Sequence, residues 1–355
     1  MIDLFNRWFQ QRLSNPQVIY LILVMSIGLA VILVAGEILA PVLASLVLAY
    51  LLDDLVLILT RRGVARLIAV LVVFLSFLVL YLLLLLGMLP LLSQQVTQLL
   101  RELPNMVALA QSGLMQLPEM YPAVFSEQQV QDLSLEIRSQ ITGASQNLMV
   151  MMTKLVSNLI TLLVYAFLIP MMIFFFVKDK PVLLRWFSGH LPDDRSLMTT
   201  VWHEVDGKLD CYVGGKLFEI FLVGLCSYIL FFWMDLPYSL LLSVVVGLSV
   251  IIPYIGATVV TIPVAAVAFV QFGIGQDFFY IMIGYGIIQA LDGNLLVPLL
   301  FSEVVNLHPL AIIIGVLFFG GLWGFWGVFF AIPLVTVISA VLNAWSDATQ
   351  EVEIR

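Results

Sequence analysis

One acidic side chain interrupts an otherwise apolar stretch in the carboxyl-terminal third of the chain. Asp292 follows Gln289 and stands beside Gly293 and Asn294. A charged carboxylate at bilayer depth costs about 3 kcal/mol or more, so such a residue is a functional candidate. Carboxylate, amide and carbonyl oxygens suit Na⁺ or another hard cation, and Asp292 could instead carry a proton. Because Asp-Gly and Asn are also common in turns, a loop at the membrane surface is the alternative interpretation.

Three more polar residues near this stretch are candidates for binding an ion or a substrate. Glu303 could be a second ion or proton group together with Asn306, or both could belong to an interfacial loop before His308. Tyr254 offers a phenol beside Pro253. Helix packing is the alternative explanation for the residues around Tyr254.

Helix-breaking residues recur where a bilayer would supply no water. They are predicted hinges or helix breaks: Pro253, Gly256, Gly293, Pro298, Gly320, Gly321, Gly324 and Gly327. The apolar segment 238–272 would be roughly 52 Å long as one straight helix, which exceeds a membrane core of about 30 Å. It must therefore break. Whether each break makes a kink, a half-helix or a re-entrant hairpin stays open.

The composition indicates an all-α, polytopic membrane protein. The chain is 62% hydrophobic and 11% charged, against roughly 25% charged residues in a typical soluble domain. Several apolar runs reach the length of a membrane span. They are continuous, whereas transmembrane β-strands alternate apolar and polar residues. The predicted partners are therefore the lipid bilayer and a small-molecule or ion substrate.

Other classes of protein lack their usual signals. The net charge is −8, and no basic patch with interleaved aromatics suggests a nucleic-acid partner. There is no P-loop, and His203-Glu204 does not complete a zinc-protease motif. The two cysteines, Cys211 and Cys226, lack metal-ligand spacing. We therefore predict no enzyme, no cofactor and no metal beyond a possible Na⁺ at Asp292.

The polarity of successive stretches predicts six segments. They are 1–90, with a cytoplasmic amino-terminal helix and spans 1 to 3; 91–153, an extracytoplasmic amphipathic helical segment; 154–177, span 4; 178–216, a cytoplasmic helical segment; 217–345, a transport core with broken helices; and 346–355, a cytoplasmic tail. A tight turn at Gly36-Glu37 is expected between spans 1 and 2.

Basic residues near span ends predict the orientation. Arg61, Arg62 and Arg66 fall on one side together with the basic residues of 178–216 and of the amino terminus. Because cytoplasmic loops carry an excess of Lys and Arg, the amino terminus is predicted to be cytoplasmic and 91–153 to face outward.

Four ordered motifs resemble the autoinducer-2 exporter family of bacterial membrane proteins, and within it the PerM-type permeases. The motifs read Ile252-Pro253-Tyr254-Ile255-Gly256; Gln289-x-x-Asp292-Gly293-Asn294-Leu295-Leu296-Val297-Pro298; Leu307-His308-Pro309-Leu310; and Gly320-Gly321-x-x-Gly324-x-x-Gly327 followed by Ala331-Ile332-Pro333-Leu334. The resemblance covers nearly the whole chain. Many members carry Glu where this chain has Asp292, so the carboxylate is kept and its reach is one methylene shorter.

The resemblance implies an inner-membrane protein of about eight spans with both termini in the cytoplasm. Some members are associated with export of autoinducer-2, others look like Na⁺(Li⁺)/H⁺ antiporters, and PerM-type members are permeases of unassigned substrate. The family therefore leaves the substrate open.

Together these observations predict a secondary active transporter that works by alternating access and is coupled to Na⁺ or H⁺. Asp292, Gln289 and Asn294 would bind the coupling ion, and spans 1–4 with the amphipathic segment 91–153 would form the scaffold and a homo-oligomer interface. The alternatives are an exporter of a small signalling molecule such as autoinducer-2 and, in a different class, a non-transporting membrane scaffold.

Overall fold

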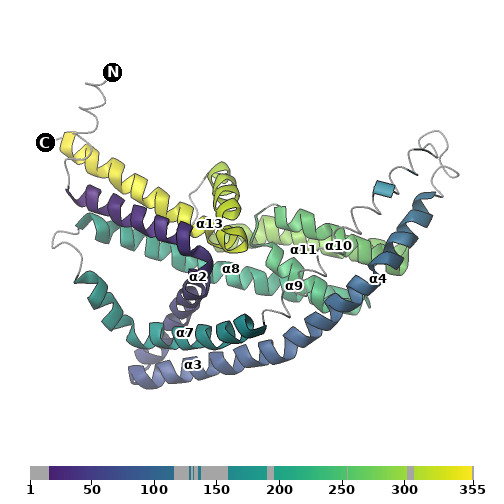
Figure 1. The fold of residues 1–355 in the computed structure, drawn as a ribbon, viewed down its shortest axis with the longest axis horizontal. Coiled ribbons are helices and arrows are strands. Elements are labelled where there is room, and N and C mark those ends of the chain that lie inside the picture. Colours follow the sequence, from purple (N-terminus) through teal and green to yellow (C-terminus); the bar gives the residue numbers. More distant parts are fainter. Residues whose placement is uncertain are drawn as a thin grey trace. The chain divides into compact units, whose positions relative to one another are not determined.

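The structure, a computed structural model, describes residues 16–115, 159–189, 196–253, 255–301 and 308–353, together with residues 128, 131, 135 and 136. Within these ranges every regular element is a helix (Figure 1). Tyr254, Glu303 and Asn306 lie outside the described residues, as do the predicted amino-terminal surface helix and most of 116–153.

The helices run in chain order along the described residues. They are α2 (Pro16–Arg61), α3 (Arg66–Leu83), the π-helix η1 (Leu84–Met88), α4 (Leu89–Met115), α7 (Leu159–Ser188), α8 (Ser196–Trp233), α9 (Ser239–Ser249), α10 (Ile255–Phe272), α11 (Gln276–Leu291), the π-helix η2 (Asp292–Leu296), α12 (Val297–Phe301) and α13 (Pro309–Glu353).

Six stretches of the described chain are long and apolar enough to cross a membrane: Ile38–Arg61, Arg66–Met106, Val201–Trp233, Ile255–Phe272, Gln276–Phe301 and Leu310–Val341. Their outer faces are apolar. In α3, for example, Leu67, Leu75 and Val79 are each more than half exposed. Such a surface fits hydrocarbon rather than water, and the prediction of an all-α polytopic membrane protein is confirmed.

The chain divides into two compact units, which are described separately. The first comprises residues 1–76, 167–218 and 297–355, and the second comprises 77–166 and 219–296. Each unit combines stretches that are far apart in the sequence, because helices from different predicted segments pack together. The predicted segmentation itself stays a prediction.

A buried carboxylate ties three helices together in the first unit. Asp53, 3% exposed near the end of α2, accepts hydrogen bonds from Arg66 at the start of α3 (3.3 Å) and from Lys180 on α7 (2.5 Å). Beside it, the Tyr50 hydroxyl donates to Asp206 on α8 (3.0 Å). Arg66, Lys180 on α7 and Asp206 on α8 therefore lie close to the end of α2 in this unit.

The turn predicted at Gly36-Glu37 is wrong, because α2 continues through both residues as one helix. Gly36 serves close packing instead. A Cβ at this position would overlap the indole of Trp323 in α13. The absence of a side chain makes room for an aromatic ring and is not used to reverse the chain.

Helix α13 folds back on itself at Gly324, which has φ 61° and ψ −137° inside an otherwise helical segment. Residues on either side of it meet: a Cβ on Gly327 would overlap the carbonyl of Phe319, and one on Gly315 would overlap Val335. Residues 20 positions apart touch only if the two arms run in opposite directions. The arm from Pro309 to Trp323 is about 22 Å long and is therefore too short to cross a bilayer core of about 30 Å alone.

A second hairpin lies in the second unit, where α9 ends at Ser249 and α10 begins at Ile255. A Cβ on Gly256 would overlap the carbonyl oxygen of Ser249, so the two helices touch directly after the break. Helix α9 has 11 residues, about 16 Å, and cannot cross a bilayer alone. Helix α9 ends before Pro253 and α10 begins after it, where the sequence predicts a break, and the two helices form a hairpin.

Small residues let α8 approach α9 closely in the same unit. A Cβ on Gly247 would lie 2.7 Å from the carbonyl oxygen of Ile220, and the backbones of Gly224 and Gly247 are in contact. Glycines at helix crossings of this kind are usual where lipid offers no hydrophobic drive to association. Around them lies one apolar core that includes Phe231, Val246 and Val264.

Candidate functional site

A stripe of polar side chains runs along one face of α11. Tyr285, Gln289 and Asp292 follow at spacings of four and three residues, which place them on the same side of a helix. Tyr285 is 2% exposed and Asp292 is 9% exposed. The carboxylate is therefore inside the protein rather than on its surface.

Helix α10 faces this stripe with hydroxyls and a shared carbonyl. The Tyr285 hydroxyl donates to the carbonyl oxygen of Ala257 (3.3 Å), and the Thr261 hydroxyl donates to the same oxygen (2.8 Å). Thr261 and Tyr285 also lie within 3.4 Å of each other. The arrangement gives α10 and α11 a polar seam in otherwise apolar helices.

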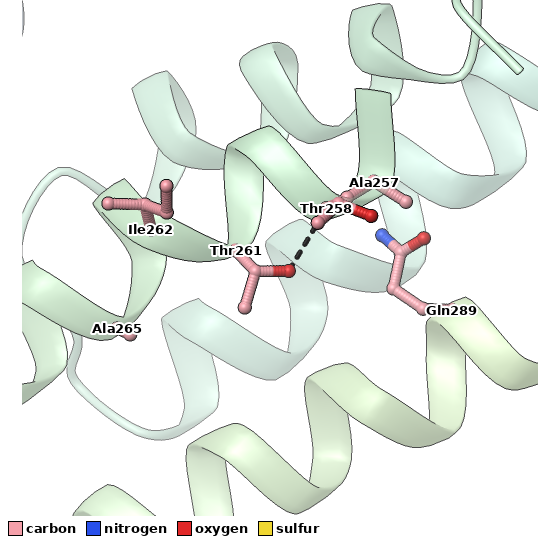
Figure 2. Close-up of a pocket in the computed structure, with 6 residues that line it drawn as sticks. All are labelled: Ala257, Thr258, Thr261, Ile262, Ala265 and Gln289. Atoms are coloured by element: carbon pink, nitrogen blue, oxygen red, sulfur yellow. Dashed lines mark hydrogen bonds between the residues drawn. The ribbon is translucent and has the colours of Figure 1, made fainter. Parts of the chain in front are cut away.

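The seam opens into a groove with a volume of about 580 Å³. Its lining residues are Ala257, Thr258, Thr261, Ile262, Ala265 and Gln289 (Figure 2). In the close-up the Gln289 amide extends from α11 toward Ala257 and Thr258 at the start of α10. Its Nε2 atom is buried and lies near the Tyr285 hydroxyl without forming a well-aligned hydrogen bond.

Asp292 opens a π-helical turn, η2, rather than the interruption that the sequence predicts. The helical path continues from α11 through η2 into α12. A π-turn inserts an extra residue without ending the helix, and such turns frequently occur at functional sites. Gly293 lies exposed in this turn, and Pro298 lies just after it, in α12. The helix is therefore widened at Asp292 and not broken.

Asn294 lies on a different side of the helix from Asp292. It is exposed, and its Nδ2 donates to the carbonyl oxygen of Ala290 (2.8 Å). This carbonyl lies four residues back, where the π-turn disturbs the regular backbone pattern. The structure thus brings Gln289 and Asp292 to one face and gives Asn294 a local backbone partner.

The α9–α10 hairpin places its turn at the end of the groove. Gly256, packed on the Ser249 carbonyl, directly precedes Ala257, whose carbonyl holds Thr261 and Tyr285. The Ser249 hydroxyl is turned back to the carbonyl of Val246 (2.7 Å). A displacement of the hairpin would therefore reach the polar seam within one residue.

The hinge glycines of α13 divide into two groups. Gly320 and Gly321 are helical residues of the first arm, whereas Gly324 makes the turn and Gly327 provides the close approach to Phe319. They belong to the first compact unit, whereas the groove belongs to the second.

Two candidate residues were not predicted from the sequence. Tyr285 is the first, although its position four residues before Gln289 and seven before Asp292 could have identified it. Glu219 on α8 is 1% exposed. Glu219 lies three residues after Lys216. The apolar residues on both sides of it could have identified it from the sequence. A carboxylate so deeply buried in a candidate span is a second functional candidate.

The chemistry available in the groove is that of oxygen ligands and hydrogen-bonding groups. Hydroxyls, a carbonyl and an amide line or border it, and one carboxylate continues the same helix face. Among the residues that the structure describes, no group of three or more His, Cys, Asp and Glu could hold a metal ion. Such a groove can bind a polar solute and place one titratable acid near it.

Comparison with known proteins agrees with this architecture. The family model described as "AI-2E family transporter" matches residues 20–347. A protein of Escherichia coli (strain K12) named "Putative permease PerM" is 43% identical over 98% of both chains. YueF of Bacillus subtilis (strain 168), named as a transport protein, is 27% identical over 84% of this chain and 82% of its own. The AI-2 transport protein TqsA of E. coli (strain K12) is 24% identical over 90% of this chain and 91% of its own.

Proposed function

Because the chain belongs to the AI-2E transporter family, we propose that it is a secondary active permease of the bacterial inner membrane in which Asp292 carries the coupling H⁺ or Na⁺. The observation that supports the proposal most directly is the burial of this carboxylate at the π-turn, on the helix face that also carries Tyr285 and Gln289. Transport, rather than catalysis, is the activity shared by the relatives' names.

The physical role of Asp292 follows from the cost of a buried charge. An ionised carboxylate at this position is stabilised when it binds a cation, and protonation neutralises it outright. Either event lowers the free energy of the state in which the polar seam is closed inside the protein. Coupling arises if the empty, charged state favours a different arrangement of the hairpin and the groove.

The α9–α10 hairpin is the proposed moving part beside the groove. Its turn contacts Gly256 directly before the shared carbonyl of Ala257. Discontinuous helices beside a polar site are the usual construction of alternating-access transporters. The α13 hairpin in the other unit is proposed to serve in the same way, with Gly324 as its hinge.

Export of a small signalling molecule is the second candidate within transport. The groove is open and its lining is mainly apolar, with two hydroxyls and one amide and no charged side chain, which suits a small neutral solute. TqsA, over nearly the whole length of this chain, is named an AI-2 transport protein. We also propose that the protein forms a homo-oligomer and that both of its termini lie in the cytoplasm.

The test measures transport by the Asp292→Asn variant, purified and reconstituted into vesicles, beside the unmodified protein. Gradients of Na⁺, Li⁺ or H⁺ are imposed across the vesicle membrane. A pH-sensitive dye inside the vesicles reports the movement of H⁺ that is coupled to them. We expect at least a tenfold loss of ion-coupled flux, because the amide can neither release a proton nor neutralise a cation. Asp292→Glu should retain part of the flux, since the charge is kept.

Asp277→Asn is the matched control, because Asp277 is an exposed acid in the first turn of the same helix, α11. It should transport like the unmodified protein. Undiminished ion flux in Asp292→Asn would refute the coupling role. A parallel assay of autoinducer-2 efflux from cells separates the exporter from the ion antiporter, and a non-transporting scaffold would show neither activity and no stabilisation by cations.

A further inference from the structure

Helix α9 begins without a local cap. Its flanking residue Tyr238 adopts a left-handed backbone, with φ 60° and ψ 26°, and makes no side-chain hydrogen bond to the first turn. The first N–H groups of any helix lack partners within the helix, and in apolar surroundings such groups are costly to leave unpaired. Something outside α9 must therefore satisfy its amino-terminal end.

Helix α4 supplies that partner. The Oε1 atom of Gln95 accepts a hydrogen bond from the backbone N–H of Leu241, the third residue of α9 (2.8 Å). The two residues are 146 positions apart in the sequence. This is a helix cap provided by a neighbouring helix rather than by the residue before the helix.

A second polar contact lies further along the same face of α4. The Tyr238 hydroxyl donates a hydrogen bond to Glu102, and burial and this bond raise the pKa of Tyr238 to about 12. Gln95 and Glu102 are seven residues apart, which puts them on one side of the helix. Between and beyond them, Leu99, Leu103 and Met106 pack into the apolar core that also contains Leu242 and Val246 of α9.

In Figure 1, α4 lies beside α9 and α10, as their contacts require. The far end of α9 is the hairpin turn, where the Ser249 carbonyl meets Gly256. Because α9 is a short rigid helix, a shift at its start is passed to its end. The end of α9 in turn adjoins Ala257, the first residue of the groove.

We propose that α4 is the positioning element of the α9–α10 hairpin: the Gln95–Leu241 and Glu102–Tyr238 contacts hold α9 in place and thereby set how far the α10–α11 groove opens. This goes beyond the transport proposal, because it assigns a conformational role to polar residues of α4 that touch neither Asp292 nor the groove. It also requires no knowledge of the substrate.

The first measurement is hydrogen–deuterium exchange of the full-length protein. Gln95→Leu removes the acceptor, Tyr238→Phe removes only the hydroxyl, and a double variant combines them. We expect exchange in residues 239–249 to rise at least fivefold in the double variant, with α11 unchanged. Gln95→Glu keeps an acceptor and should restore most of the protection. Gln98→Leu, at an exposed position of α4 that lies between Gln95 and Glu102 and takes part in neither contact, is the matched control.

The second measurement reports on the groove. Thr258→Cys is introduced after Cys211→Ser and Cys226→Ser, and its alkylation rate by a small maleimide is measured. The double variant should change this rate at least threefold relative to Gln98→Leu. Unchanged exchange in α9 overturns the proposal. Faster exchange with an unchanged alkylation rate overturns it too, because the contact would then hold α9 without controlling the groove.

Either result is independent of the Asp292→Asn flux experiment, so failure of one proposal can be distinguished from failure of the other. If the double variant does not fold, Tyr238→Phe alone gives the same two readouts, since it deletes a single oxygen atom.

Discussion

At the scale of single residues, Asp292 and Tyr285 show what spacing can and cannot reveal. The rarity of a carboxylate in an apolar run identifies Asp292 from the sequence alone. The burial of Asp292 and its position on the face of Tyr285 required the structure. The grouping of Asp292 with Asn294 relied on adjacency, but neighbours in a helix point in different directions, and Asn294 in fact bonds to Ala290.

Tyr238 provides a prediction about pH. The pKa of its phenol is raised to about 12 from an ordinary value near 10. The folded state therefore favours the protonated form, and the resulting stabilisation is complete below pH 10 and is lost as the pH rises from 10 to 12. The total is about 2–3 kcal/mol. Tyr238→Phe should abolish this part of the alkaline loss of stability.

Ultraviolet titration of tyrosinate measures the same group directly. The difference between the unmodified protein and Tyr238→Phe should be one phenol that titrates near pH 12. Tyr280→Phe, at an exposed position in α11, is the control. A difference curve centred near pH 10 would show that Glu102 and burial do not act on Tyr238.

At the scale of helices, breaks were predictable and their form was not. The excess length of 238–272 required an interruption, and Pro253 and Gly256 located it. Whether the chain kinks or reverses depends on contacts across the break, such as Gly256 on Ser249 and Gly315 on Val335. No single stretch of sequence contains such contacts. The same limit explains Gly36, where packing against Trp323 replaced a predicted turn.

The glycines of the hairpins make a second prediction. Gly327→Ala and Gly256→Ala each place a methyl group against a backbone carbonyl, of Phe319 and Ser249 respectively. Overpacking of this kind costs about 1–3 kcal/mol, so the melting temperature in detergent should fall by several degrees. Gly321→Ala adds its methyl group in open space and should leave melting unchanged or slightly raised. Equal melting of all three variants would contradict the two hairpin contacts.

At the scale of the whole molecule, the sequence predicts the class of protein more securely than its internal packing. The class of protein is inferred from the long runs of apolar residues. This inference holds even where the predicted ends of a span are wrong by a few residues. The division into two units, each assembled from distant segments, could not be read from the order of the spans. In the first unit, the Asp53, Arg66 and Lys180 cluster supports one common side for the basic residues.

Orientation can be tested with a native thiol. Cys211 is exposed on α8 and belongs to the segment predicted to be cytoplasmic. In a Cys226→Ser background, a membrane-impermeant maleimide should label Cys211 in inverted vesicles and not in intact spheroplasts. Gln98→Cys, exposed on α4 in a Cys211→Ser, Cys226→Ser background, should show the opposite pattern. Labelling of both from the same side would contradict the predicted topology.

The reversal at Gly324 has a consequence for how the chain is counted across the bilayer. A segment that enters and leaves the bilayer through the same leaflet adds residues to the membrane region without adding a crossing. Because the two arms of α13 run in opposite directions, we expect residue 353 to lie on the side of the membrane from which Pro309 enters. The parity of the full crossings before Pro309 would then decide which side that is.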